Sequence, residues 1–255
     1  GYIGLEAAAS LRTLGMQVTV VEAMEHVLQR VTCETVSSFF SRVHAEEGVE
    51  IQTGTAVSAL HGDHHVSGVE TGSGQVIPAD LVIVGIGIVP NVELASGAGL
   101  DTDNGVAVNQ FAQTSDQDIY AIGDCASFVH PRYQRRIRLE SVQNANDQAV
   151  TAARSICGQN EPYDALPWFW SDQFDVKLQI AGLAEGAGQM IVRGDTQTGR
   201  SASVLYLQDE RLIAVDAMNN PRDFVFGKKL IIDNVRLDVA KLADADSQLN
   251  AAMVD

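Results

Sequence analysis

The chain has 255 residues, of which 45% are hydrophobic and only 6 are proline, which excludes a disordered or fibrous protein and predicts one or two globular domains. The longest apolar run, Leu81–Val89, is about half of the roughly 20 residues that a membrane-spanning helix needs, so we expect no membrane segment. Seventeen basic and 33 acidic side chains give a net charge of −16, which disfavours nucleic-acid binding because phosphate backbones are repelled.

The first 48 residues predict a helix, a strand and a second helix. An Ala- and Leu-rich helix is expected from near Gly4 to Gly15, a residue suited to the left-handed turn that ends helices. A short buried strand, Val18–Glu22, follows it. The second helix, residues 30–47, is stopped by a glycine and has one apolar side made of Val31, Val36, Phe39, Phe40 and Val43. Strands alternating with helices predict a parallel sheet.

The middle of the chain predicts a further set of strands. Residues 49–77 contain VEIQTG, AVSAL and HVSGVET between Gly- and Asp-bearing turns, which indicates an inserted antiparallel meander. Leu81–Ile88 and Ile119–Ile122 are expected to be buried strands of the parallel unit, and residues 141–157 are expected to form a helix.

The character of the sequence changes after Pro167. SDQFDVKLQIAGL, GQMIVRGD and SASVLYLQDERLIAVDAMN are three strand candidates separated by turns, and a terminal helix is expected from about Pro221. We therefore expect a domain boundary near residues 158–166, with an α/β region before it and an α+β domain after it.

The opening segment GYIGLEAAASLRTLG matches the end of a G-x-G-x-x-G dinucleotide fingerprint, with Gly1 and Gly4 as its last two glycines. The first glycine and its strand would precede residue 1, so we expect the chain to be part of a longer protein. Glu22 ends the next strand, where a carboxylate meets the ribose hydroxyls of the adenosine. The following residues offer no positive charge to a 2′-phosphate, which favours NADH over NADPH. In the alternative interpretation, Gly4 only packs and Glu22 is a solvated acid.

Four segments carry a family resemblance: GYIGLEAAA, LVIVGIGIVPNVELA, IYAIGDCA, and RLESVQNANDQA followed by PWFWSDQFDVKLQIAGL. The chain resembles the FAD-dependent, NADH-linked ferredoxin reductases of bacterial oxygenase systems, such as putidaredoxin, rhodocoxin and rubredoxin reductases. The resemblance implies a Rossmann-like NAD-binding domain without its first strand at residues 1–97. It places the C-terminal half of an FAD-binding domain at 98–165 and a small α+β reductase domain at 166–255.

The resemblance also implies FAD and NAD as cofactors and assigns residues to them. Asp124, after a strand and a glycine, would anchor the ribityl chain of the flavin; alternatively it is a turn or helix-cap aspartate. Gly85 and Gly87 leave a strand end without side chains, which suits the approach of a nicotinamide ring, or close packing of strand on helix.

Further contacts follow from the same resemblance. Glu6 would lie near the nicotinamide end of NADH, although the helix dipole alone favours an acid in this first turn. Four residues match segments that border the isoalloxazine ring: Ser141, Val142, Trp168 and Trp170. Ordinary packing of the two tryptophans is the alternative. No residue is expected to act as an acid or base, because the cofactors supply the chemistry, and the histidines of HGDHH are read as a solvated loop rather than a metal site.

The implied function is transfer of electrons from NADH through FAD to a 2Fe–2S ferredoxin or a rubredoxin. No histidine follows His130 and no dithiol is present, which argues against disulfide reduction. A basic cluster of Arg132, Arg135, Arg136 and Arg138 is a hypothetical docking patch for an acidic ferredoxin, or else a set of structural ion pairs. The three cysteines form no CxxC pair and no leader is recognised, so a cytoplasmic location is expected.

Two other functions stay open from the sequence. An NADH oxidase or a nitrite-reductase-like flavoprotein would use the same cofactors with another acceptor. A catalytically incomplete nucleotide-binding fragment is the third reading, because the glycine loop for the FAD pyrophosphate is absent from these residues. The isolated 255 residues are then expected to hold flavin poorly.

Overall fold

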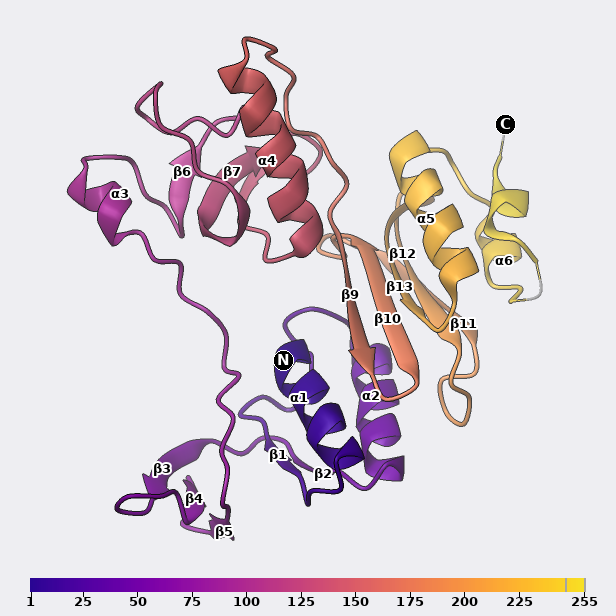
Figure 1. The fold of residues 1–255 in the computed structure, drawn as a ribbon. Helices are drawn as coiled ribbons and strands as arrows, with labels where there is room; N and C mark the ends of the chain where they lie inside the picture. The colour runs from indigo at the N-terminus through magenta and orange to yellow at the C-terminus, as the bar shows by residue number, and fades with distance from the viewer. Residues whose placement is uncertain (246, 255) are drawn as a thin grey trace. The chain divides into compact units, whose positions relative to one another are not determined.

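A computed structural model describes residues 1–245 and 247–254 (Figure 1). The chain divides into two compact units. Unit 1 comprises Gly1–Gly87, Trp170–Ile180 and Ala184–Asp255, and unit 2 comprises Ile88–Phe169 and Ala181–Leu183. Among the described residues, no helix has both the length and the apolar character needed to cross a lipid bilayer.

The helices are α1 (Tyr2–Thr13), α2 (Glu34–Glu46), α3 (Glu93–Gly97), α4 (Val142–Ile156), α5 (Pro221–Asp233) and α6 (Val239–Leu242), with 3₁₀ turns η1 (Gly123–Cys125) and η2 (Leu249–Ala252). The strands of the first part are β1 (Thr19–Val21), β2 (Glu50–Gln52), β3 (Val57–His61), β4 (Gly68–Thr71), β5 (Val76–Pro78), β6 (Val106–Val108), β7 (Ala126–His130) and β8 (Arg135–Ile137). The strands of the last part are β9 (Trp168–Gln173), β10 (Val176–Gly182), β11 (Gln189–Gly194), β12 (Ala202–Gln208) and β13 (Arg211–Met218).

The first helix and strand form where the sequence predicts them. α1 buries Leu5, Ala8 and Ala9, and the chain turns after it at Gly15, whose φ of +87° suits glycine. β1 is half-buried rather than buried. It pairs in parallel with β2, so β2 belongs to the parallel sheet and its expected place in the antiparallel meander is wrong. The meander itself is confirmed for β3, β4 and β5, which pair antiparallel in that order.

The second helix begins later than predicted. Cys33 has extended backbone angles at the N-cap position, so α2 starts at Glu34 and not at residue 30. Val31 therefore lies before the helix and is 37% exposed, which corrects its assignment to the apolar face. The other four apolar positions of that face are at most 1% exposed. The hydrophobic period was thus right over the helix proper.

The predicted strand Leu81–Ile88 is wrong. These residues form an irregular chain between β5 and α3 (Figure 1), and Leu81, Val84 and Ile86 are 59%, 66% and 83% exposed. A central parallel strand is hydrophobic because neighbours cover it on both sides. Among the described residues no strand pairs with this segment, so its apolar side chains stay at the surface.

Unit 2 contains a three-stranded sheet of order β6-β7-β8, with β6 parallel and β8 antiparallel to β7. Its core includes Val108, Phe128, Ile137 and Tyr163. The predicted helix over 141–157 is confirmed as α4. The predicted strand Ile119–Ile122 is wrong, since this segment makes only an isolated bridge at Tyr120 before entering η1.

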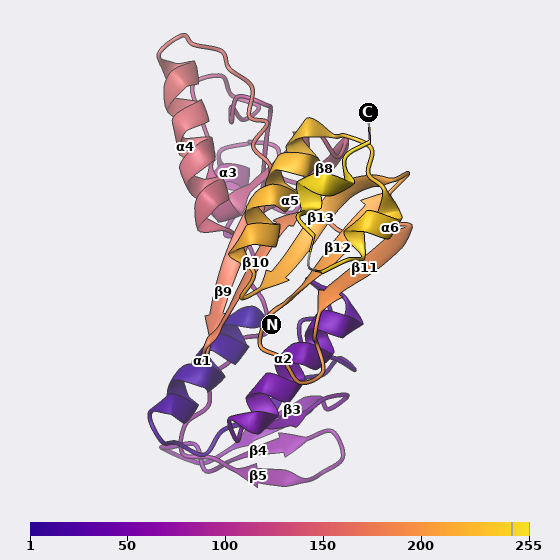
Figure 2. The same cartoon turned by 90° about the vertical axis from the view of Figure 1, so that its right-hand side faces the viewer.

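The last part of the chain forms a five-stranded sheet of order β11-β12-β13-β10-β9, most of which belongs to unit 1. The three predicted strand regions form five strands, because one turn separates β9 from β10 and another separates β12 from β13. α5, confirmed at its predicted start Pro221, packs against β13 (Figure 2). Gly227 allows this close contact, because a Cβ there would lie 2.8 Å from Cγ1 of Val215. The predicted fold class, a Rossmann-like α/β region followed by a small α+β domain, is confirmed.

Candidate functional site

The start of α1 brings four predicted nucleotide-binding residues together. The backbone nitrogen of Gly1 lies 3.5 Å from Oε2 of Glu22, at the end of β1. A Cβ built on Gly85 would lie 3.4 Å from the backbone nitrogen and Cα of Gly4. The two glycine segments thus approach each other backbone to backbone, next to a carboxylate. A helix N-terminus with bare backbone groups and an adjacent acid is the arrangement that dinucleotide sites use.

The carboxylate of Glu22 is held in place by its own turn. Its Oε1 accepts a hydrogen bond from the backbone nitrogen of Met24 at 3.0 Å, and the side chain is 21% exposed. The backbone nitrogen of Glu22 donates to the carbonyl of Gln52 at 2.9 Å. One carboxylate oxygen thus supports the turn while the other faces Gly1, so the binding role of Glu22 stays a prediction.

Gly87 has a backbone conformation that favours glycine. Its φ is +112°, and the nearest atom to a Cβ placed there would be Nη1 of Arg30, at 3.9 Å. Gly85 and Gly87 are both exposed. Gly87 therefore offers open backbone, whereas the approach of Gly85 to Gly4 fits the alternative of close packing on a helix, and the nicotinamide contacts of both stay predictions.

The predicted nicotinamide contact, Glu6, lies in α1 two residues after Gly4. Its Oε1 accepts a hydrogen bond from the hydroxyl of Ser171 in β9, at 2.6 Å. Sequence reasoning did not identify Ser171 as a partner. Trp170, the neighbour of Ser171, is 38% exposed, so it is a surface aromatic of unit 1 rather than a core residue.

The residues predicted to bind flavin in unit 2 form two groups. Gly123 has φ +72°, donates from its nitrogen to Oε1 of Gln148 at 2.7 Å, and a Cβ there would lie 3.4 Å from Cβ of Ala145. Asp124 follows it in η1 and is exposed, while its carbonyl accepts from Arg138 at 3.0 Å. Because no strand ends here, the expected strand-end position of Asp124 is wrong, although its exposed carboxylate stays available to a hydroxyl-bearing ligand.

The second group lies at the N-terminus of α4. The hydroxyl of Ser141 caps the helix by accepting from the backbone nitrogen of Asn144 at 3.2 Å. Val142 is 60% exposed at the first helical position. The backbone nitrogen of Trp168 donates to Oε1 of Gln143 at 3.2 Å, which places Trp168 beside the same helix end. The three residues therefore share one helix N-terminus, and their flavin contacts stay predictions.

Sequence reasoning missed the buried amides of α4. Gln143, Asn144 and Gln148 are at most 7% exposed. Oδ1 of Asn144 accepts from the hydroxyl of Tyr163 at 2.9 Å, and Gln148 holds the Gly123 turn. Three amide side chains at this spacing on one side of a helix were the available signal, because such a side would normally be apolar.

The basic cluster of unit 2 is engaged in internal contacts. Arg136 pairs with Asp103 at 3.3 Å and also donates to the carbonyl of Ser127 at 2.8 Å. Arg138 pairs with Glu140 at 2.7 Å, and its side chain is 9% exposed. Both observations favour structural ion pairs for these two arginines, and ferredoxin docking by the cluster stays a prediction.

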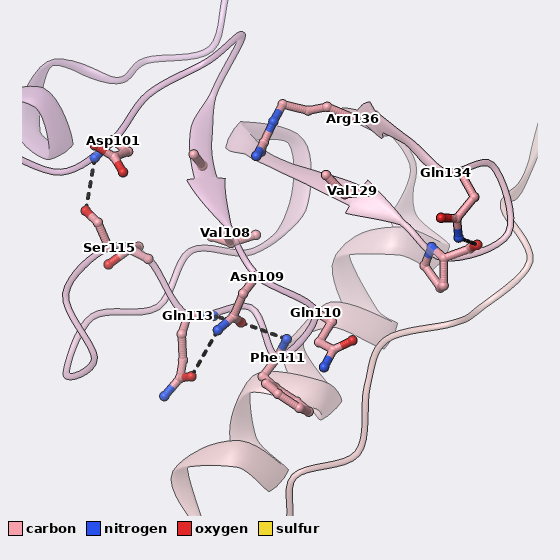
Figure 3. A pocket seen from close by; sticks show the side chains of 13 residues that line it. Asp101, Val108, Asn109, Gln110, Phe111, Gln113, Ser115, Val129, Gln134 and Arg136 are labelled. Carbon is pink, nitrogen blue, oxygen red and sulfur yellow. Dashed lines mark hydrogen bonds between the residues drawn. The ribbon is translucent and has the colours of Figure 1, made fainter.

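Unit 2 has a hollow of about 610 Å³ whose lining contains none of the residues predicted to bind a cofactor (Figure 3). Its lining includes the loop from Asn109 to Ser115. Oδ1 of Asn109 accepts from the backbone nitrogens of Phe111 and Gln113, at 2.8 and 3.1 Å. These bonds give the loop its shape, and the hollow holds no cluster of groups suited to catalysis.

Known proteins resemble the chain over nearly all of its length. Residues 1–149 match the family described as pyridine nucleotide-disulphide oxidoreductase, and residues 168–253 match the family described as reductase C-terminal. The chain is 48% identical over 252 residues to the 5,5′-dehydrodivanillate O-demethylase ferredoxin reductase subunit of Sphingobium sp., covering 98% of the chain and 61% of the relative. It is 43% identical to rhodocoxin reductase of Rhodococcus erythropolis, covering 99% and 59%.

Solved structures agree with these relatives. The putidaredoxin reductase in its covalent complex with putidaredoxin has a TM-score of 0.94 and 44% identity, covering 99% of this chain and 62% of that one. The ferredoxin reductase for the CYP199A2 system of Rhodopseudomonas palustris has a TM-score of 0.93 and 42% identity, covering 100% and 63%. The chain belongs to the pyridine nucleotide-disulphide oxidoreductase family, and its resemblance to ferredoxin reductases is confirmed. It spans about 60% of the length of the curated relatives it matches.

Proposed function

We propose that the protein transfers electrons from NADH through FAD to a 2Fe–2S ferredoxin or a rubredoxin. The observation that carries the proposal is the meeting of Gly1, Gly4, Gly85 and Glu22 at the start of α1. The relatives named for ferredoxin, rhodocoxin and putidaredoxin reduction support the acceptor class. The domain limits 1–97, 98–165 and 166–255 and a cytoplasmic location are part of the same proposal.

NADH is the proposed electron donor because the site offers an acid to the adenosine ribose. A carboxylate accepts hydrogen bonds from two free ribose hydroxyls but repels a 2′-phosphate. Glu22 is suitably placed, with one oxygen 3.5 Å from the nitrogen of Gly1. NADPH is therefore the poorer substrate.

FAD fits the groups that unit 2 presents. Gly123 allows its turn to pack closely against Ala145 of α4, which fixes the position of the following Asp124. The exposed carboxylate of Asp124 is able to accept hydrogen bonds from the ribityl hydroxyls, and Ser141, Val142 and Trp168 stand at one helix N-terminus. When bound, FAD would supply the acceptor for the hydride of NADH and the capacity to release electrons singly. The chain's residues hold and orient the cofactors and supply no acid or base.

The decisive experiment uses the full-length protein with its flavin, in the absence of oxygen. NADH is expected to bleach the flavin absorbance in a stopped-flow instrument, and a 2Fe–2S ferredoxin is expected to restore it within turnover time. Oxygen alone should restore it far more slowly. Faster reoxidation by oxygen than by any ferredoxin or rubredoxin would support the oxidase alternative. Absence of bleaching by NADH would refute the proposal.

The role of Glu22 in NADH binding is tested with the variant Glu22→Ala, and Glu25→Ala is the matched control. Glu22 faces Gly1, whereas Glu25 is exposed and three residues away. Loss of a charge-assisted hydrogen bond should raise the Kd for NADH about tenfold in Glu22→Ala and leave it unchanged in Glu25→Ala. Equal affinities in all three proteins would remove Glu22 from the site.

A further inference from the structure

The second half of β9 carries two polar side chains on a buried face. Ser171 and Gln173 are 0% exposed, whereas Trp170 and Asp172, which alternate with them, are exposed. A buried strand face is normally apolar, because each unsatisfied polar group destabilises the fold. Polar groups retained there need partners, and the partners of these two lie in α1 and α2.

The buried face is part of a chain of three hydrogen bonds. Nε2 of His44 lies 2.9 Å from Oε1 of Gln173, and Nε2 of Gln173 donates to Oγ of Ser171 at 3.0 Å. The hydroxyl of Ser171 donates to Oε1 of Glu6 at 2.6 Å. The chain therefore links α2 through β9 to α1, within unit 1.

The hydrogen bonds all point the same way. A carboxylate only accepts hydrogen bonds, so the hydroxyl of Ser171 donates its single hydrogen to Glu6. It must therefore accept a hydrogen bond from the amide of Gln173. The amide oxygen of Gln173 then accepts from the Nε2 hydrogen of His44. Burial lowers the pKa of His44, so the ring is neutral at pH 7. With the hydrogen on Nε2, Nδ1 is an acceptor, and this buried atom has no partner among the described residues. Bonds aligned in series strengthen one another in a buried site.

The carboxylate at the end of this chain belongs to the glycine-turn helix. Glu6 follows Gly4 by two residues, and Gly4 is the residue against which Gly85 packs. Ser171 is the hydrogen-bonding partner that the structure gives to the Glu6 side chain. The position of the carboxylate is therefore set by a strand outside the glycine turn.

We propose that Ser171 is a positioning residue, whose hydroxyl fixes the Glu6 carboxylate toward the nicotinamide half of bound NADH. This role rests on the proposed function, in which NADH occupies the start of α1. Without the hydroxyl, the Glu6 side chain samples several rotamers and a ligand has to order it on binding. Gln173 and His44 contribute by holding the hydroxyl hydrogen in the direction of Glu6.

The test compares two ligands in the full-length flavoprotein by titration calorimetry. NAD⁺ contains the nicotinamide half, whereas ADP-ribose retains the adenosine and pyrophosphate without it. Ser171→Ala should raise the Kd for NAD⁺ about tenfold and change that for ADP-ribose less than twofold. Ser203→Ala is the matched control, because Ser203 is also 0% exposed in unit 1 but its hydroxyl has no hydrogen-bond partner in the described part of the chain. It should change neither affinity.

A double-mutant cycle shows whether Ser171 affects NAD⁺ binding through Glu6. In a Glu6→Ala background, Ser171→Ala should weaken NAD⁺ binding by less than a further twofold. If Ser171→Ala does not fold, Ser171→Cys, which keeps the size with a weaker donor, should show the same selective loss in reduced form. Equal weakening of both ligands, or an effect that persists without Glu6, would overturn the positioning role. A wild-type protein that binds neither ligand would overturn the proposed function and this role with it.

Discussion

The C-terminal sheet and the segment 81–89 are both strongly apolar, yet they differ in structure. In β12, residues 202–207 are at most 3% exposed and pair with strands on both sides. In the segment 81–89, seven of the nine residues are large apolar side chains with exposures that reach 87% at Val89. Apolar character alone therefore did not produce a strand.

The difference lies in where the pairing partners come from. β11, β12 and β13 follow one another along the chain, so short turns bring each strand to its neighbour. A parallel strand depends on partners that are distant in the sequence. A hydrophobic run is thus buried as a strand only where neighbouring strands are present to pair with it. Three predictions test this difference, in decreasing order of expected size.

The largest effect is expected at a buried ion pair that anchors the C-terminal residues to the sheet. Arg193 is 2% exposed, pairs with Asp223 at 3.0 Å and donates to the carbonyls of Asp244 and Ser247, each at 2.7 Å. Arg193→Leu leaves a buried carboxylate unpaired and should lower the free energy of unfolding by about 3–5 kcal/mol.

The control for Arg193 is the same substitution at an exposed ion pair. Arg154 and Glu161 are 51% and 63% exposed, and Arg154→Leu should lower the free energy of unfolding by less than about 1 kcal/mol. Urea denaturation measures both variants. Similar losses in the two would show that the C-terminal sheet does not depend on its buried pair.

The second prediction compares the same change, Leu to Ala, in β12 and in the segment 81–89. Leu205 in β12 is 0% exposed and Leu81 is 59% exposed. In the 255-residue chain, Leu205→Ala should lower the free energy of unfolding by about 3 kcal/mol, since it creates a cavity. Leu81→Ala should lower it by less than about 0.5 kcal/mol. A comparable loss at Leu81 would mean that segment 81–89 is buried after all.

The smallest effect is a pH dependence inside the sheet. Burial raises the pKa of Asp216 to about 6, against the hydrogen bonds that it accepts from Thr32 and Tyr206. Its protonated form is thus favoured in the folded state, and stability is lost as the pH rises from about 4 through 6. A shift of about two units corresponds to about 2–3 kcal/mol at pH 7.

Asp216→Asn removes this titration. The free energy of unfolding of the wild type minus that of the variant should fall between pH 4 and 7, as followed by urea denaturation at each pH. The difference is needed because the lowered pKa of His44 acts oppositely, reducing stability as the pH falls below 6.5. If this difference does not change with pH, burial does not raise the pKa of Asp216 in the folded protein and the prediction is wrong.

Helices were predictable because their signals are local. The glycine after α1 and the proline at the start of α5 are adjacent to the elements they delimit. The turns that divide the C-terminal strands were not predictable. Phe174, Asp209 and Glu210 have φ of +55°, +50° and +60°. Gly or Asn usually marks this conformation, and neither stands at these positions, so an aspartate is the weak turn signal in each segment.

The site was predictable only in part. Gly1 and Glu22 meet as the fingerprint implies, because the motif specifies a local strand-turn-helix geometry. Ser171 was missed because alternation along WFWSDQ suggests tryptophans inside and polar residues outside. The structure has the reverse order at Trp170 and Ser171. Alternation assigns residues to two faces, but it does not say which face is covered.

The amide in the middle of the His44–Gln173–Ser171–Glu6 chain has a consequence for charge movement. A side-chain amide neither gains nor releases a proton at ordinary pH, so Gln173 blocks Grotthuss-type conduction between the imidazole and the carboxylate. His44 therefore cannot supply protons to Glu6 along this chain of hydrogen bonds. The hydrogen-bond chain conveys orientation only, which agrees with the proposed hydride transfer, a step that needs no acid.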